Sequence, residues 1–161
     1  MYFERASLRP HSYYGTGGIA SQLYLPESSS ELSEVVKRLI KNKTHWFLLG
    51  AGTNSLVSDE PWPHAVIGFS ELNRLSFSGS ATKAGAGVEN TLFSTKAFEK
   101  ELAGAEFMYR LPGQMGATVR MNARCYGGEM RQIVSRVTAV SPQTGEISFF
   151  ESKEAFRGYK D

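Results

Sequence analysis

The segment LPGQMGATVRMNARCYGGE, residues 111–129, is the most informative part of this chain of 161 residues. Its glycines and alanines leave stretches of backbone without bulky side chains. Because glycine has no Cβ, its N–H group can turn inward and approach a phosphate or a flat ring closely. The segment therefore predicts a place where the backbone itself lies beside a large ligand.

A second glycine-rich loop, Gly50–Ser55, follows the apolar run Trp46–Leu49. Apolar residues at consecutive positions are typical of a strand that is covered on both faces. In the dinucleotide-binding pattern G-x-G-x-x-G the third glycine opens a helix, but here Ser55 stands at that position. Residues 56–61 contain a proline and no helical pattern, so the loop does not match an ordinary dinucleotide site.

The same loop still offers groups that suit a pyrophosphate. Its N–H groups and the side chains of Thr53, Asn54 and Ser55 can surround phosphate oxygens without a cation. The alternative is a tight turn between two strands, which is a common use of glycine. The presence of two such glycine-rich loops favours one extended ligand that contacts both. If the first loop binds its phosphate, a valine in place of Gly52 is expected to fill the space that the phosphate needs.

Composition places the chain among globular proteins of one domain or two small lobes, with 41% hydrophobic and 21% charged residues. The net charge is only +2, and lysine and arginine are spread along the chain, so we expect no nucleic-acid partner. A single cysteine, no secretory signal and no apolar run of bilayer length together predict a cytoplasmic protein without a membrane partner. The sequence leaves the oligomeric state open.

Helical and strand patterns are intermixed along the chain, which predicts an α+β fold. The predicted elements are a helix over 30–42, strands at 46–49 and 66–68, a hairpin of 74–78 with 81–86, a helix over 90–102 and a hairpin of 137–140 with 147–150. Serines at 28–30 and Asn42 are the expected ends of the first helix.

We interpret the histidines, the cysteine and two charged residues as structural rather than catalytic. The three histidines, at 11, 45 and 64, have no metal-ligand spacing with one another or with Cys125, so we expect no metal site. Cys125 has no second cysteine nearby and is interpreted as an inert, packed thiol. Arg120 and Glu129 are expected to form surface ion pairs, the alternative being that either pairs with a substrate or cofactor group.

Four glycine motifs together resemble the MurB family, the UDP-N-acetylenolpyruvoylglucosamine reductases. They are Gly17–Ala20 with the nearby Leu25–Ser28, then Gly50–Ser55, Gly85–Val88 and the segment 111–129, and the resemblance runs from about Leu8 to the last residue. It implies a two-lobed FAD-binding fold of the vanillyl-alcohol-oxidase type, with FAD held between the lobes. We expect one lobe at 1–70 and a second, incomplete lobe at 71–161, with the C-terminal substrate lobe absent.

The resemblance also implies which residues bind FAD. Those on the pyrophosphate side are Gly50, Ala51, Gly52, Thr53, Asn54 and Ser55. Those on the flavin side are Pro112, Gly113, Gly116, Ala117, Asn122 and Gly127. Arg124 stands where the family has glycine. A positive φ there would cost backbone strain, whereas an ordinary φ would leave the side chain pointing to solvent or to a phosphate.

In the family, NADPH reduces the flavin, and the flavin reduces the enolpyruvyl ether of a UDP-sugar to give UDP-N-acetylmuramate for peptidoglycan synthesis. The catalytic cation is an arginine, and Lys160 stands at the corresponding position. The proton-donating serine and a late glutamate would lie beyond residue 161, so we expect a fragment that is inactive alone. The alternatives are another FAD-dependent oxidoreductase on this scaffold and a non-catalytic paralogue that binds flavin or a protein partner.

Overall fold

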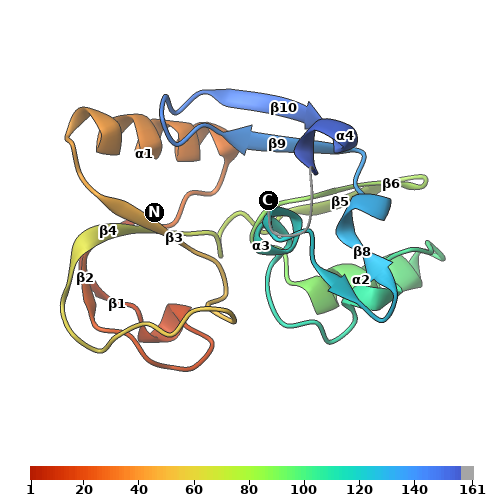
Figure 1. The fold of residues 1–161 in the computed structure, drawn as a ribbon, viewed down its shortest axis with the longest axis horizontal. Coiled ribbons are helices and arrows are strands. Elements are labelled where there is room, and N and C mark those ends of the chain that lie inside the picture. The colour runs from red at the N-terminus through yellow and green to blue at the C-terminus, as the bar shows by residue number, and fades with distance from the viewer. Residues whose placement is uncertain (157–161) are drawn as a thin grey trace. The chain divides into compact units, whose positions relative to one another are not determined.

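The computed structural model describes residues 1–156 and divides the chain into two compact units (Figure 1). Unit 1 contains Met1–Leu72 together with Ala139–Ser148, and unit 2 contains Asn73–Thr138 and the residues from Phe149 onward. Lys160 lies outside the described residues.

Unit 1 is built on a four-stranded mixed sheet. Its strands are β1 (Tyr2–Ser7), β2 (Ile19–Tyr24), β3 (Trp46–Leu49) and β4 (Trp62–Gly68), in the order β1-β2-β4-β3. Strand β1 is antiparallel to β2, whereas β2 and β3 both run parallel to β4. A 3-10 helix, η1 (Arg9–His11), lies in the connection from β1 to β2.

The two faces of this sheet bury different residues. Val66 faces a core that also contains Leu8 and Leu23, whereas its neighbours Ala65 and Ile67 face a second core on the opposite side. Such alternation follows from the two-residue period of a strand. Helix α1 (Ser29–Lys41) covers the second core, as Figure 1 shows, and the loops on either side of β2 and before β4 close the first.

The predicted helix over 30–42 is confirmed within one residue at each end. Ser28 is the N-cap, and its hydroxyl accepts the N–H of Glu31 at 3.1 Å. Asn42 closes the other end, where its N–H donates to the carbonyl of Arg38 at 3.0 Å. Buried Val36 and Leu39 lie on the face toward the sheet, as the apolar spacing predicts.

The prediction that Trp46–Leu49 is buried on both faces is wrong. Strand β3 lies at the sheet edge, and Phe47 and Leu48 are 50% and 62% exposed. The central position belongs to β4, whose C-terminal half contains the predicted strand 66–68 and is fully buried. The apolar run therefore predicted a strand correctly but placed it wrongly inside the sheet. The position of a strand depends on its pairing with strands that are distant in the sequence.

The second predicted hairpin, at 137–140 and 147–150, is also confirmed as β9 (Arg136–Val140) and β10 (Ile147–Glu151). The N–H of Ser141 donates to the carbonyl of Glu146 at 2.8 Å across the turn. Within unit 1, the Ser33 hydroxyl donates to the carbonyl of Gly145. A short helix, α4 (Ser152–Ala155), follows β10.

Unit 2 surrounds a core of Val88, Phe93, Phe107, Met108 and Met130. Its elements are β5 (Leu75–Ser78), β6 (Ala81–Ala84), α2 (Asn90–Glu99), η2 (Glu106–Met108), α3 (Met115–Arg120), β7 (Arg124–Cys125), β8 (Gly128–Glu129) and η3 (Met130–Gln132). The β5–β6 hairpin matches the prediction, with Gly79 at φ 57 in its turn. Helix α2 begins at the predicted Asn90 but ends three residues early.

Candidate functional site

The loop Gly50–Ser55 leaves the end of β3 and opens no helix, as its sequence predicts. Gly52 is buried and has a φ of +70°, a conformation that favours glycine. A Cβ on Gly52 would lie 3.0 Å from both the Cα of Ser12 and the backbone nitrogen of Tyr13. A side chain at position 52 would therefore meet the chain's own residues 11–13.

The rest of the loop is more open. Asn54 and Ser55 are exposed, and Gly50, Ala51 and Thr53 are partly exposed. The Tyr14 hydroxyl donates to the Thr53 carbonyl at 3.4 Å. The groups that remain accessible for a ligand are thus on the side chains and backbone around Asn54.

The segment that packs on Gly52 is itself anchored. The N–H of Gly17 donates to the Asp59 carboxylate at 2.9 Å, and Arg9 lies 3.3 Å from the same group. The hydrogen bond from Gly17 and the charge of Arg9 outweigh the effect of desolvation and lower the pKa of Asp59. A Cβ on Gly18 would overlap the carbonyl of Glu60, so close backbone contact fixes this end as well.

Two hydroxyls in the connection from β1 to β2, which contacts Gly52 through Ser12, are buried without a partner among the described residues. They are Ser12 Oγ and Thr16 Oγ1. A buried hydroxyl that lacks a partner is costly, so such groups often point to a missing water or ligand. They are compatible with a polar ligand at this loop.

In unit 2, the segment at Gly113–Gly116 lies against the glycine-rich segment at Gly85–Asn90. Residues Glu89 and Gln114 form an antiparallel bridge, and the N–H of Gly116 donates to the carbonyl of Ala86 at 2.8 Å. A Cβ on Gly116 would lie 2.8 Å from the Cβ of Ala86. The third glycine motif of the sequence is thus the packing surface for the start of α3.

Two buried amide side chains at this contact also have an unpartnered atom within the described part of the chain. Asn90 is 1% exposed, and its Oδ1 accepts from the Thr118 hydroxyl at 2.9 Å, but its Nδ2 has no partner. Gln114 is 9% exposed, and its Oε1 has none. The contact between the two glycine-rich segments therefore leaves one amide donor and one amide acceptor without a partner among the described residues.

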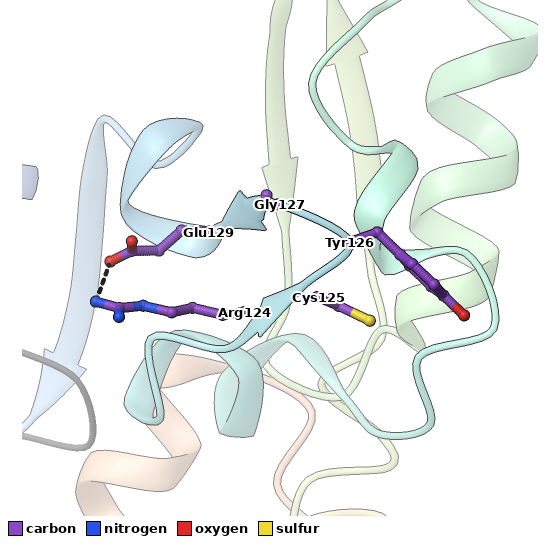
Figure 2. Close-up of a pocket in the computed structure, with 6 residues that line it drawn as sticks. Arg124, Cys125, Tyr126, Gly127 and Glu129 are labelled. Atoms are coloured by element: carbon purple, nitrogen blue, oxygen red, sulfur yellow. Dashed lines mark hydrogen bonds and ion pairs between the residues drawn. The ribbon is translucent and has the colours of Figure 1, made fainter.

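The end of the same segment forms a tight hairpin of β7 and β8. Its turn residues Tyr126 and Gly127 both have positive φ, at 48° and 81°, which is typical of a two-residue hairpin turn. A cavity of about 320 Å³ is lined by the consecutive residues Arg124–Glu129. Figure 2 shows Arg124 and Glu129 pointing toward each other, while the ring of Tyr126 extends away from them.

Glu129 is buried rather than on the surface, so its predicted surface ion pair is wrong. Its carboxylate lies 2.7 Å from the Nε of Arg131 and 3.2 Å from a guanidinium nitrogen of Arg124. Burial alone would raise its pKa, but hydrogen bonds from Asn122 and Arg124 and the two positive charges lower it. The carboxylate is therefore held ionised inside the unit.

This arrangement also decides between the alternatives for Arg124. Arg124 belongs to strand β7 and is not among the non-glycine residues with positive φ, so no backbone strain arises there. Its side chain pairs with Glu129. Cys125 is partly buried and packs against the core of unit 2, which confirms the packed thiol.

Residues 1–156 contain no group of three or more histidine, cysteine or acidic side chains arranged to hold a metal. His11 has a pKa lowered by desolvation, which outweighs the opposing charge of Glu71. The ring centroids of His45 and His64 lie 5.7 Å apart.

No helix within the described residues is long and apolar enough to cross a bilayer.

Sequence reasoning missed the unpartnered groups of Ser12, Thr16, Asn90 and Gln114. The first two fall in a run of small and aromatic residues that has no helical or strand period, and this irregularity was the available signal. Asn90 and Gln114 give no local signal, because their burial depends on the contact between two distant glycine segments.

Comparison with known proteins adds three kinds of match. The model of the FAD-binding domain family matches residues 20–150. The UDP-N-acetylenolpyruvoylglucosamine reductase of Alkaliphilus oremlandii is 31% identical over 95% of this chain and 50% of its own length. That of Streptococcus pyogenes is 34% identical over 98% of this chain and 53% of its own length. The chain thus spans about half the length of these curated relatives.

Solved structures agree with the sequence matches. The crystal structure of UDP-N-acetylenolpyruvylglucosamine reductase (MurB) from Thermus caldophilus is similar with a TM-score of 0.78 and 30% identity, over 98% of this chain and 55% of that chain. The 6-hydroxy-D-nicotine oxidase of Arthrobacter nicotinovorans shares the fold alone, with a TM-score of 0.63 and 17% identity over 84% of this chain and 31% of that chain. The predicted α+β fold class and the resemblance to the MurB family are confirmed.

Proposed function

This chain belongs to the FAD-binding domain family, and from that premise we propose that it is the FAD-binding portion of a MurB-like reductase. The reaction would convert UDP-N-acetylenolpyruvoylglucosamine to UDP-N-acetylmuramate, with NADPH as reductant, in the cytoplasm. The supporting observation is the match of nearly the whole chain, in sequence and in structure, to reductases with this name. Lower-identity neighbours share only the fold and favour no second activity.

The residues proposed to hold FAD fall into the two units. In unit 1, the loop Gly50–Ser55 would bind the pyrophosphate, chiefly through the accessible groups around Asn54, with the unpartnered hydroxyls of Ser12 and Thr16 as additional donors. In unit 2, the flavin-side segments would be Pro112–Ala117 and Asn122–Gly127. Support comes from their glycine content and from the unpartnered amide groups of Asn90 and Gln114.

Bound FAD would supply hydride transfer between NADPH and the enolpyruvyl double bond. The residues of this chain would bind and orient the cofactor through fixed backbone N–H groups, which need no rearrangement when the ligand arrives. Lys160 remains the proposed cation for the substrate, with a point charge where arginine would offer a planar fork.

FAD binding to the purified chain tests this proposal. After mixing with FAD and gel filtration, we expect the protein peak to retain flavin absorbance and the flavin fluorescence to change on titration. Anaerobic addition of NADPH should then bleach the visible flavin band. Absence of flavin from the protein peak would contradict the FAD-binding role, and a bound flavin that NADPH leaves oxidised would contradict only the choice of reductant.

A further inference from the structure

Glu129 is the one charged residue classed as buried among residues 1–156. A buried carboxylate pays a large desolvation cost, and an apolar residue of similar volume would often give equal or greater stability. Glu129 ends β8 and caps η3, and burial of apolar surface does not explain a carboxylate at this position. The contacts of this carboxylate suggest a reason for its presence.

The first set of contacts closes the chain around the carboxylate. The Asn122 amide and the guanidinium groups of Arg124 and Arg131 all reach one oxygen, Oε1. The Glu129 side chain also accepts the N–H of Gln132, and the Gln132 side chain accepts the N–H of Glu129 at 2.9 Å in return. The carboxylate thus connects residues before the hairpin with residues after it.

The second set of contacts fixes Asn122 itself. Its Oδ1 accepts the N–H of Arg131 at 3.0 Å, while its Nδ2 donates to Glu129. Asn122 is 2% exposed and has a φ of +43°, a left-handed conformation that a non-glycine residue adopts at a cost unless its surroundings hold it. The backbone bond from Met130 N–H to the Ala123 carbonyl, at 3.1 Å, completes the closure.

The result is a short hairpin with a closely bonded base and a tip that is open to solvent. Tyr126 is 90% exposed, and a Cβ on Gly127 would meet no atom within 4 Å. Figure 2 shows the Arg124–Glu129 ion pair on one side of this hairpin and the tyrosine ring on the other. A tip with no packing of its own depends on its base for its position.

We propose that Glu129 is a positioning residue that holds Asn122 and the turn Tyr126–Gly127 in the geometry that receives FAD. This inference rests on the proposed function, since it assigns a purpose to the flavin-side segment. Glu129 itself would touch no cofactor atom. Its role is to fix, through Asn122 and Arg124, the backbone that does.

The chain contains a matched control for this residue. Glu151 also pairs with an arginine, Arg136, at 2.9 Å, and also forms a reciprocal capping contact with the residue three positions later, Glu154. The side chain of Glu151 is 61% exposed, whereas that of Glu129 is 11% exposed. Substitution of each glutamate by glutamine therefore removes the same charge and a comparable pair from a buried and an exposed site.

The experiment titrates FAD into the wild-type chain, Glu129→Gln and Glu151→Gln, and records flavin fluorescence, visible circular dichroism at saturation and thermal unfolding. We expect Glu129→Gln to weaken FAD affinity by about tenfold or more and to change the flavin dichroism, because loss of a charged hydrogen-bond acceptor loosens the hairpin. Glu151→Gln should overlay the wild type. Equal affinity and dichroism in the two variants would overturn the positioning role.

Two further outcomes keep the test decisive. If Glu129→Gln does not fold, hydrogen exchange of the wild-type chain replaces it, and FAD should slow exchange of the amides at 122–128. Unchanged exchange there, with FAD bound, would overturn the inference while leaving the proposed function intact. A wild-type chain that takes up no FAD would overturn both.

Discussion

The loop Gly50–Ser55 in unit 1 and the hairpin Asn122–Glu129 in unit 2 both expose backbone, but they hold it in opposite ways. Gly52 lies so close to the backbone of residues 11–13 that a side chain would have no room. The hairpin has open space around Gly127 and is held instead by a buried carboxylate and its arginine partners. A backbone segment without side chains can thus be held in place by close packing or by an ion cluster around a buried carboxylate. Different substitutions and conditions should therefore destabilise the two regions.

The largest effect is expected at the packed loop. Gly52→Val combines a positive φ with contacts of 3.0 Å to backbone atoms, neither of which can yield easily. We expect the free energy of unfolding to fall by about 3 kcal/mol or more. Urea denaturation followed by circular dichroism measures this. A loss below about 1 kcal/mol would mean that residues 11–13 move aside readily.

A second packed glycine should show an intermediate effect. Gly116→Ala places a Cβ 2.8 Å from the Cβ of Ala86, where the start of α3 meets the segment before α2. Overpacking of this kind costs about 1 to 3 kcal/mol. The double variant with Ala86→Gly should recover part of that stability, and a double-mutant cycle without recovery would show that the contact is not the cause.

The open hairpin turn should tolerate a side chain much better. Gly127→Ala meets nothing within 4 Å, so only the left-handed φ of +81° opposes it. We expect a loss of about 1 kcal/mol in thermal or urea unfolding. A loss as large as that of Gly52→Val would remove the contrast between the two regions.

The ion cluster should instead respond to acid. The lowered pKa of Glu129 means that its stabilising contribution is complete above the ordinary glutamate pKa of about 4.3, and is lost as the pH falls through the lower, folded value. Unfolding measured between pH 7 and pH 5 should therefore show no pH dependence that comes from Glu129, because its contribution is constant there. Below that range, the stability of Glu129→Gln should depend less steeply on pH than that of the wild type. Parallel slopes would contradict the ionised, buried carboxylate.

Features with a local cause were predictable. The helix over residues 29–41 follows from apolar spacing and a serine cap, and the hairpins follow from turn residues such as Gly79. Features with a distant cause were not. Strands β1 and β2 were missed, and β3 was wrongly expected to be covered on both faces, because strand order depends on which strands pair. Helix α3 was also missed, since Gly116 and β-branched Thr118 and Val119 favour helix weakly.

For the candidate site, too, the features with a local cause were predictable from the sequence and those with a distant cause were not. Glycine content predicted a ligand lying beside bare backbone, because the absence of a Cβ is a property of the residue itself. The order of the motifs carried the resemblance to the MurB family, and that resemblance implied the FAD-binding fold. The space beside Gly52, the burial of Glu129 and the unpartnered amides of Asn90 and Gln114 emerged only in the folded chain. Burial and contact are set by segments far apart in sequence, so no local pattern can encode them.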